Sequence, residues 1–433
     1  MKGPRQGNRR ADRDTLEAKP KPKLKPQPQQ LKRQPKKPEP VEEDQNLDDE
    51  AANTSGINLS SPIPLSLQQL LLDVFKTALL ASPASTEANT SSEPQFESLD
   101  IKALIQTIKS HLYQRDFDSA FTEAGEDHLR AYALRWSASR ALGYAGLFKG
   151  VLSWMRQQDG VDPNSGSRVV CLGGGAGAEI VALAAAWRQL DDLDKDKAAV
   201  ASLSEQAEGL SLQEGAAGAA GADDSARAHK RSIAAVDIAD WSSVVKRLAG
   251  TLTSAAVPAP STSKHKAPLL AAGGEVDVGF HRVDLLGLPE EELKDVVLGG
   301  AEHAVSPSSL LVTLMFTLNE LFSTSMPKTT AFMLRLTEIL KPGAVLLVVD
   351  SPGSYSTLKL GKPGPDGVQQ ERNYPMKFLL DHTLISVAKG QWELVYTQDS
   401  RWWRRDAPRL MYDVGDGAGL EDMRFQVHIY RRI

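Results

Sequence analysis

Residues 169–179 read Val-Val-Cys-Leu-Gly-Gly-Gly-Ala-Gly-Ala-Glu. Four apolar residues lead into the glycines, and an alanine-rich pattern of helical spacing follows at once. This order predicts a strand, a glycine turn and the N-terminus of a helix. Glycines let the backbone turn tightly and let a ligand approach it, while free N–H groups at a helix N-terminus favour polar or anionic ligands. The stretch therefore predicts a site for a nucleotide-like cofactor, contacted by Gly173, Gly174, Gly175 and Gly177.

The N-terminus differs in composition from the rest of the 433-residue chain. Residues 1–40 carry 13 lysines and arginines against four acids, and residues 42–50 carry six acids and no base. Rich in proline and without aromatic residues, residues 1–58 are predicted to be a disordered tail, first basic and then acidic. The basic run at 32–37 suits a nuclear import signal or an electrostatic RNA tether, and equally a solubilising tail. The remaining chain is net acidic, so nucleic-acid contacts outside the tail are expected in local patches.

Cysteine usage narrows the class of protein. Cys171 is the only cysteine, which excludes intramolecular disulfides and a cysteine-based zinc site and fits a reducing compartment. The eight histidines are scattered, so no metal site is expected. The longest apolar run, 310–318, is too short to span a bilayer, and the basic N-terminus lacks the apolar core of a secretory signal.

Apolar spacing organises the rest of the chain. Helical spacing at 66–82, 99–112 and 120–136 predicts a helical N-terminal region over 59–150. Strand candidates alternating with helical patterns then predict an α/β, Rossmann-like domain over 151–433. Two low-complexity stretches, 191–228 and 254–274, are predicted to be loop insertions. The strand candidates after the glycine turn lie at 233–236, 276–283, 310–316, 344–349, 392–397 and 425–430. No clear helix precedes the last of them, so we expect a mostly parallel seven-stranded sheet that ends in an antiparallel hairpin.

An acid at the end of the second strand is the expected partner of the glycine turn, because it binds ribose hydroxyls in this class of fold. Asp237 stands there, 60 residues beyond Gly177, and removing the 38 residues of the first insertion leaves 22, close to the roughly 20 that such folds show. Asp284 and Leu285 follow the third strand, where they could contact an adenine. The glycines also fit a nicotinamide dehydrogenase, so the spacing alone leaves both cofactors open.

The order of these features resembles the class I S-adenosylmethionine-dependent methyltransferases. They share the glycine turn, the acids after the second and third strands, a Leu-Lys-Pro-Gly turn at 340–343 before the fifth strand, and the terminal hairpin. Cys171 departs from the superfamily pattern, because the first motif often has an acid at this position. The resemblance implies S-adenosylmethionine as the cofactor.

Longer blocks are similar to the fungal 25S ribosomal RNA uridine-N3 methyltransferases. These blocks lie at 135–144, 171–179, 316–322, 350–355 and 400–404, and the resemblance covers about 65–433 without the insertions. It implies methyl transfer from S-adenosylmethionine to N3 of a uridine in large-subunit rRNA. It also implies a ribosomal RNA or pre-ribosomal partner and a nuclear or nucleolar location, or a cytoplasmic one as well.

Methylation at uridine N3 requires an unpaired base in a pocket and a group that takes the N3 proton. Asn319 and Glu320 follow the fourth strand, where superfamily members usually keep polar groups that face the substrate. Our hypothesis is that Asn319 orients the uracil edge and that Glu320 receives or relays the proton. The alternative is that Glu320 flanks a helix that begins near Met326 and Pro327.

Basic and aromatic residues mark the candidate RNA contacts, since aromatic rings stack on bases and arginines bind phosphate. Two tryptophans that are neighbours in a strand point to opposite sides, so one of Trp402 and Trp403 should be exposed. For Arg135, Trp136 and Arg140 the alternative is ordinary packing, and for Tyr355 it is a plain turn. The candidate RNA-binding residues are Arg135, Trp136, Arg140, Tyr355, Arg401, Trp402, Trp403 and Arg404.

Two other functions remain open from the residues themselves. A nicotinamide-dependent Rossmann enzyme would bind NAD(P) in place of S-adenosylmethionine. A non-catalytic RNA-binding assembly factor would keep the basic and aromatic patches and lose the cofactor, and the departure at Cys171 leaves room for it. We expect a monomer.

Overall fold

A computed structural model describes residues 52–53, 56–80, 99–158, 166–209, 230–270, 276–300, 305–353, 355–360 and 370–433. Most of the predicted tail lies outside these residues. The folded part nevertheless begins before the predicted boundary at residue 58, because β1 (Ala52–Asn53) pairs with β9 (Trp392–Trp403) and Ile57 is buried. No described helix is long and apolar enough to cross a membrane.

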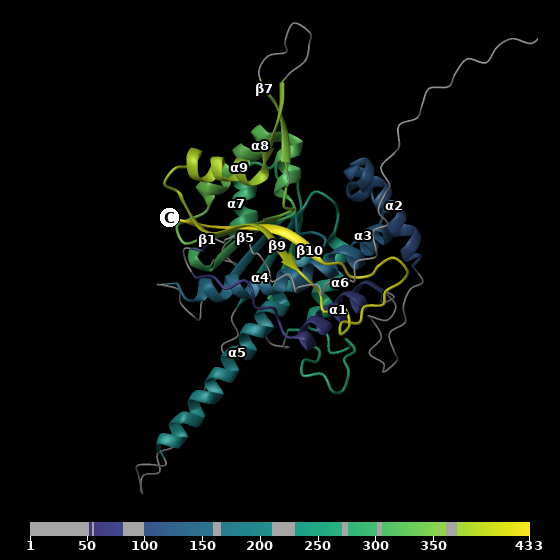
Figure 1. Cartoon of the computed structure of the whole chain (residues 1–433), viewed down its shortest axis with the longest axis vertical. Coiled ribbons are helices and arrows are strands. Elements are labelled where there is room, and N and C mark those ends of the chain that lie inside the picture. Colours follow the sequence, from purple (N-terminus) through teal and green to yellow (C-terminus); the bar gives the residue numbers. More distant parts are fainter. Residues whose placement is uncertain are drawn as a thin grey trace, which may run out of the picture. The chain divides into compact units, whose positions relative to one another are not determined.

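One mixed sheet organises the domain (Figure 1). Its strand order is β1-β9-β10-β6-β5-β2-β3-β4, with the five strands from β6 to β4 parallel and β10 antiparallel to both β6 and β9. The predicted seven-stranded, mostly parallel sheet with a terminal hairpin is thus confirmed, and the two-residue β1 extends it. The remaining strands are β2 (Ser167–Leu172), β3 (Arg231–Asp237), β4 (Val276–Arg282), β5 (Leu310–Met315), β6 (Val345–Asp350) and β10 (Met423–Arg432).

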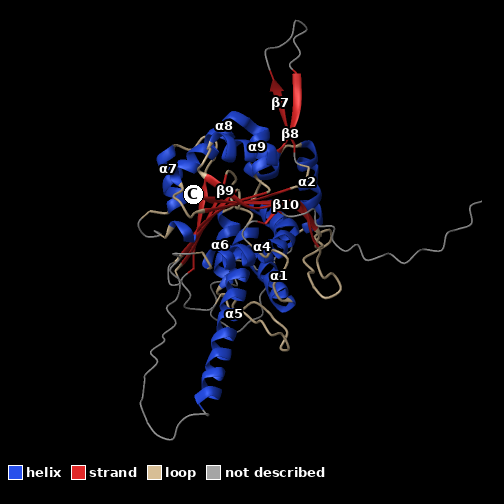
Figure 2. Cartoon of the chain, turned by 60° about the vertical axis from the view of Figure 1, so that its left-hand side comes forward, coloured by secondary structure: helices blue, strands red, loops and turns tan. Residues whose placement is uncertain are grey.

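Helices cover both faces of the sheet, which explains why β5 and β6 are buried along their whole length and mostly apolar, without alternation, with Thr313 and Asp350 as the polar exceptions. Figure 2 shows the two layers. One layer consists of α1 (Leu65–Leu80), α4 (Ala138–Arg156), α5 (Ala178–Gly209) and α6 (Ser242–Leu252). The other consists of α7 (Glu290–Leu298), α8 (Leu318–Ile339) and α9 (Met376–Asp381), which continues as a π-helical turn, η6 (His382–Val387).

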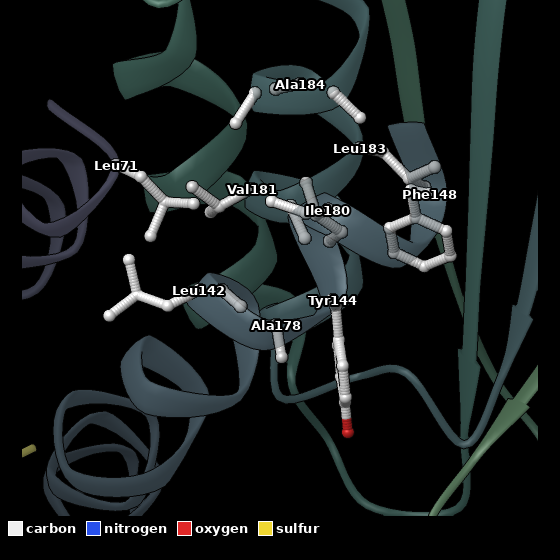
Figure 3. Packing of buried hydrophobic residues seen from close by; sticks show 14 of the residues in the cluster. Leu71, Leu142, Tyr144, Phe148, Ala178, Ile180, Val181, Leu183 and Ala184 are labelled. Carbon is white, nitrogen blue, oxygen red and sulfur yellow. The ribbon is translucent and has the colours of Figure 1, made fainter. Parts of the chain in front are cut away.

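The predicted helical N-terminal region packs into the first layer. Figure 3 shows α1, α4 and α5 meeting through Leu71, Leu142, Phe148 and Val181, while the Tyr144 hydroxyl points away from Phe148. Among the described residues between α1 and α4 there are four further helical elements. They are α2 (Ile101–Gln114), η2 (Asp118–Thr122), α3 (Glu126–Tyr132) and η3 (Ala133–Ser137).

Two parts of the fold differ from the sequence-based expectation. Helix α5 runs to Gly209, so the first half of the predicted insertion at 191–228 is helical and not a loop. Lysine, alanine, leucine and glutamate are strong helix formers even in a low-complexity sequence. In contrast, residues 254–270 of the second predicted insertion contain no helix or strand. A hairpin of β7 (Tyr355–Leu360) and β8 (Gln370–Pro375), which projects from the sheet region in Figure 2, was not predicted.

Candidate cofactor and RNA sites

The glycine turn joins β2 to α5 at the carboxyl edge of the sheet. Gly173 and Gly177 have φ values of 82° and 83°, which residues with a Cβ rarely adopt. A Cβ at Gly173 would also overlap Thr317, and a Cβ at Gly177 would overlap Leu248. At Gly175 a Cβ would lie 2.7 Å from the Asp237 Cβ. The turn therefore needs glycine for its backbone angles, and also because Thr317, Leu248 and Asp237 approach it closely.

Asp237 ends β3 and faces the turn. Its Oδ2 accepts a hydrogen bond from the Gly175 N–H at 3.2 Å, and its Oδ1 accepts one from the Ala239 N–H at 3.1 Å. Burial raises the pKa of Asp237, while these N–H donors lower it. The structure thus brings Asp237 to the glycine turn, where the predicted ribose contact requires it to be.

An aromatic group beside the turn was missed from the sequence. Trp241 is buried four residues beyond Asp237, and its Cγ would lie 2.7 Å from a Cβ at Gly175. Ring centroids place Tyr132 5.7 Å and Phe121 6.0 Å from it, and Trp136 packs 4.9 Å from Tyr132. Trp136, predicted to contact RNA, therefore belongs to a wall near the cofactor site. In the sequence, the only signal for this aromatic group is that Trp241 follows so closely after Asp237, the acid at the end of the strand.

Glu179 is a second residue whose place only the structure reveals. It lies in the first turn of α5 and is buried, with Oε1 accepting a hydrogen bond from the Thr313 Oγ1 at 3.2 Å. A Cβ at Gly174 would lie 3.0 Å from Glu179 Oε2 and 2.6 Å from the Cys171 Cβ. Burial raises the pKa of Glu179 to about 7. A carboxyl group from the helix therefore lies next to Cys171, the position at which the superfamily often has an acid.

The residues after β4 are divided between surface and core. Asp284 is exposed, and its Oδ1 accepts the Leu286 N–H at 3.0 Å. The side chain of Leu285 is buried in the core between the sheet and α7 and α8. Of this predicted pair, only Asp284 has a side chain that is open at the carboxyl edge.

Asn319 and Glu320 lie in the first turn of α8, directly after β5. Helix α8 begins at Leu318, but Ser325, with φ −161° and ψ 101°, is not helical and divides it into two helical segments. The second segment begins near Met326 and Pro327, as expected, and Glu320 lies in the short first segment ahead of it. Figure 1 shows α8 and β7 on the same side of the sheet.

Asp350 fixes this turn from the neighbouring strand. It is buried at the end of β6, and its Oδ2 accepts the Asn319 N–H at 3.1 Å while its Oδ1 accepts the Ser351 N–H at 2.8 Å. Asn319 Oδ1 is buried and has no hydrogen-bond partner among the described residues. Glu320 is exposed at the mouth of the turn, and partial desolvation and the Asp350 charge raise its pKa while Arg115 lowers it. The turn thus offers an unsatisfied amide group beside a carboxyl group.

The predicted block at 401–404 alternates between two environments. Trp402 is 45% exposed, pairs with Arg424 across the hairpin, and has the guanidinium carbons of Arg404 and Arg424 5.3 and 5.7 Å from its ring. We call Trp402, Arg404 and Arg424 the Trp402 platform. Arg401 instead donates from Nη2 to the Leu59 carbonyl at 2.8 Å. One tryptophan is exposed, as predicted, and Arg401 has a structural partner.

Trp403 and Arg135 turn towards the protein. Trp403 lies against α4, 3.4 Å from where a Cβ of Gly143 would be. Arg135 is buried and forms an ion pair with Glu421. Arg135 is thus not open at the surface: it pairs with the exposed Glu421, and its Nε and Nη1 are buried without a hydrogen-bond partner among the described residues, so its contact with RNA stays a prediction. Tyr355, by contrast, is 56% exposed at the start of β7.

Arg140 is held among aromatic rings and not on an open surface. Its Nη1 donates to the Tyr132 hydroxyl at 3.0 Å, and its Cζ lies 5.1 Å from the Phe316 centroid. Phe316 directly follows β5, so this guanidinium lies near the glycine turn. Within the described residues, no cluster of three or more metal-ligating side chains could hold a metal ion.

Two of the solved structures that resemble this chain are methyltransferases. An O-methyltransferase family 2 protein from Planctomyces limnophilus in complex with apigenin is 13% identical, covering 87% of each chain with a TM-score of 0.34. Human N-acetylserotonin methyltransferase in complex with SAM is 12% identical, covering 85% of this chain and 94% of its own, with a TM-score of 0.24. The fold assignment rests on the strand order above and not on these low scores.

Sequence comparisons are more specific. The 25S rRNA (uridine(2843)-N(3))-methyltransferase of Saccharomyces cerevisiae is 30% identical over 368 residues, which is 84% of this chain and 85% of the yeast protein. The model of the family described as "Putative SAM-dependent methyltransferase" matches residues 87–431. The glycine turn, Asp237 and the unsatisfied polar atom at Asn319 fit such a cofactor and its reaction. The chain therefore belongs to this family of S-adenosylmethionine-dependent methyltransferases.

Proposed function

We propose that this protein methylates N3 of a uridine in large-subunit ribosomal RNA. The yeast relative, named for this reaction, supports the proposal at 30% identity. The observation that carries it is the unsatisfied Asn319 side chain at the carboxyl edge, beside Asp350 and close to Glu320. An amide matches the uracil edge, because its N–H can donate to a carbonyl oxygen beside N3 and leaves N3 itself open to the base and the methyl group.

In this proposal the first turn of α8 holds the substrate base. Bound S-adenosylmethionine would supply an electrophilic methyl group, held by the glycine turn, with Asp237 on its ribose. Asn319, fixed through its backbone by Asp350, aligns the uracil so that N3 faces the methyl group. Glu320 takes the N3 proton, and its raised pKa makes it a better base near neutral pH than an ordinary glutamate.

The Trp402 platform is a proposed RNA contact at the same edge of the sheet. Gln426 pairs with Asp350 at the end of β6, and Arg424 lies two residues further along β10. With a rise of about 3.3 Å per residue, the platform extends roughly 7 Å past the catalytic edge. An exposed tryptophan between two arginines can stack on an unpaired base and bind the adjacent phosphates. Tyr355, at the base of the β7–β8 hairpin, is a second exposed aromatic residue for this role.

The cellular setting is proposed on the same grounds. We propose that the protein acts as a monomer on ribosomal RNA or a pre-ribosomal particle, in the nucleus or nucleolus. Size-exclusion chromatography with light scattering and localisation of the tagged full chain test these two statements directly.

Nucleoside mass spectrometry of large-subunit rRNA tests the reaction. Cells lacking this protein should lose one 3-methyluridine, and the wild type should restore it. Gly175→Arg should not, because its side chain would overlap Trp241 and Asp237. Gly250→Arg is the matched control, since no atom lies within 4 Å of a Cβ at Gly250. Unchanged 3-methyluridine with altered ribosome assembly would instead support a non-catalytic scaffold.

A further inference from the structure

Arg140 is a cation without a paired carboxylate among the described residues. It projects from α4 towards Tyr132 and Phe316, and only its hydrogen bond to the Tyr132 hydroxyl occupies its donors there. Phe316 is held in place by a strained backbone: its φ is 60°, and its N–H donates to the Val349 carbonyl at 2.7 Å. The next residue, Thr317, lies against Gly173. The open donors of Arg140 are therefore held beside the glycine turn.

Glu179 approaches the same turn from α5. Its carboxyl lies close to Gly174, and Thr313 holds one of its oxygens. Arg140 reaches the turn beside Phe316 and Glu179 reaches it at Gly174, and no ion pair joins the two among the described residues. Cys171 cannot supply the negative charge, because burial raises the pKa of its thiol. Two opposite charges thus face the glycine turn without neutralising each other by contact.

We propose that Arg140 and Glu179 form a clamp for the amino-acid end of S-adenosylmethionine, the guanidinium binding its carboxylate and Glu179 its ammonium group. A zwitterion carries both charges on one carbon, so it fits two opposite charges that lie near each other without touching. Glu179 then takes over from α5 the position of the acid that Cys171 replaces. The clamp concerns the cofactor alone and holds whichever nucleotide of the RNA is methylated.

The clamp explains the enclosed position of Arg140, which would not suit an arginine that contacts RNA phosphate. A phosphate-binding arginine benefits from an open surface, whereas Arg140 lies against the rings of Tyr132, at the end of α3, and Phe316, which follows β5. A purely structural arginine would have its donors satisfied by the protein, as Arg130 does through the Leu79 carbonyl at 2.5 and 2.9 Å. Arg140 fits neither pattern and fits an anionic ligand at the turn.

Two ligands that differ only in the amino-acid end separate the clamp from the rest of the site. S-adenosylhomocysteine carries the zwitterion, and 5′-methylthioadenosine keeps the nucleoside and lacks it. By isothermal titration of the full chain, Arg140→Met and Glu179→Gln should each weaken S-adenosylhomocysteine binding by roughly tenfold to hundredfold. Binding of 5′-methylthioadenosine should stay within about twofold of wild type, which also shows that the variants are folded. Arg140→Lys should recover part of the loss, because it restores the charge without the planar fork.

A pH series adds a readout that a structural role would not give. In the wild type, affinity for S-adenosylhomocysteine should fall as the pH drops from 8 to 6 while Glu179 protonates, and in Glu179→Gln this part of the pH dependence should vanish. The groups that face Glu179 and could contribute are Cys171 on β2, Asp237 on β3, Thr313 on β5, and Arg140 and Tyr144 on α4. Binding of 5′-methylthioadenosine should not share the Glu179-dependent part.

The outcomes are distinct. Arg156→Met, at the far end of α4 where Arg156 pairs with Asp194 at 3.3 Å, is the matched control and should bind both ligands like wild type. Equal loss of both ligands in Arg140→Met and Arg140→Lys would assign Arg140 a structural role and overturn the clamp, as would unchanged S-adenosylhomocysteine affinity in either Arg140→Met or Glu179→Gln. If the wild type bound neither ligand, the cofactor assignment would fail before the clamp is tested.

Discussion

Replacing Glu179 by Gln should stabilise the folded protein at alkaline pH. Glu179 is 3% exposed, and its carboxyl lies among the glycine turn, Cys171 and Thr313. Burial raises its pKa from 4.5 to about 7. The glutamine amide has nearly the same shape and can still accept from the Thr313 hydroxyl, but it needs no charge in this environment.

The sign and size of the effect follow from proton linkage. Because the pKa in the folded state is raised, the carboxyl's contribution to stability is fully present below pH 4.5 and is lost as the pH rises through about 7. A tenfold change in an acid equilibrium corresponds to about 1.4 kcal/mol, so the ionised carboxylate costs the folded state about 3 kcal/mol at high pH. The glutamine variant escapes this cost. Its advantage over wild type should therefore grow by about 2 to 3 kcal/mol between pH 5 and pH 8.5.

Urea unfolding of both proteins at several pH values, without ligand, measures this difference. Glu126→Gln is a control of opposite sign, because Glu126 accepts the Ser243 hydroxyl at 2.6 Å and pairs with Arg247, and its pKa is lowered. That variant should lose stability at high pH. If the difference in free energy of unfolding between Glu179→Gln and wild type stayed constant from pH 5 to pH 8.5, the reasoning would be refuted. Such a result would show that folding does not raise the pKa of Glu179.

Four further outcomes are expected. Trp402→Ala should weaken single-stranded RNA binding by about 1–3 kcal/mol in fluorescence anisotropy, with S-adenosylhomocysteine binding unchanged; wild-type RNA affinity would remove the platform from the interface. Arg404→Ala and Arg424→Ala should each lower the slope of log affinity against log salt by roughly 0.7, and an unchanged slope would argue against phosphate contact. Glu320→Gln should slow single-turnover transfer by roughly 10²–10⁴-fold while both ligands still bind; near-normal transfer would exclude Glu320 as the base. Gly177→Ala should lose about 1–3 kcal/mol of stability, measured by urea unfolding, because it must strain a φ of 83°; an equally stable variant would mean that the turn relaxes.

The sequence predicts the elements whose burial is uniform. The strands β5 and β6 are mostly apolar runs, with only Thr313 and Asp350 polar, because both of their faces are covered, and such runs are visible without any structure. Asp237 was also predictable, because the distance along the chain from the glycine turn to the end of β3 depends on one helix and one insertion. The hydrogen bond from Gly175 to Asp237 shows that this counting places the two residues correctly.

Other features depend on contacts that cross the chain. The hairpin of β7 and β8 has no apolar alternation over Gln-Glu-Arg-Asn-Tyr-Pro, so its strands carry no periodic signal. Glu179 is charged in the sequence, and only the approach of Thr313 and Gly174 shows that its carboxyl is buried. From the sequence alone Arg135 would be expected in solvent, because its partner Glu421 lies 286 residues away along the chain. A pattern of residue types along the chain does not reveal long-range partners of this kind.

The block at 135–144 was expected to contact RNA, and its helix instead stands between the two sites. Arg140 and Tyr144, one turn apart on α4, face the cofactor side. Ser139 and Gly143, also one turn apart, face the strands of the terminal hairpin: the Ser139 hydroxyl accepts the Glu421 N–H at 3.1 Å. The residues of this block therefore serve two neighbouring faces of one helix: one face lies towards the cofactor site and the other packs against the terminal hairpin.

This arrangement makes RNA binding sensitive to a glycine that touches no RNA. A Cβ at Gly143 would overlap the end of the Met423 side chain and lie 3.4 Å from Trp403 Cγ. Met423 and Trp403 form the last pair of the hairpin, next to Trp402 on the opposite face. The end of Met423 can move aside, but the branched side chain of Gly143→Val would also press on the Trp403 ring. Gly143→Val should therefore displace the platform and weaken RNA binding several-fold, with little effect on 5′-methylthioadenosine. Gly146→Ala, on the same helix with its nearest atoms at 3.6 Å, should bind RNA normally. Equal RNA affinity in the two variants would show that α4 does not position the hairpin, and the platform would then have to be placed by β6 and β10 alone.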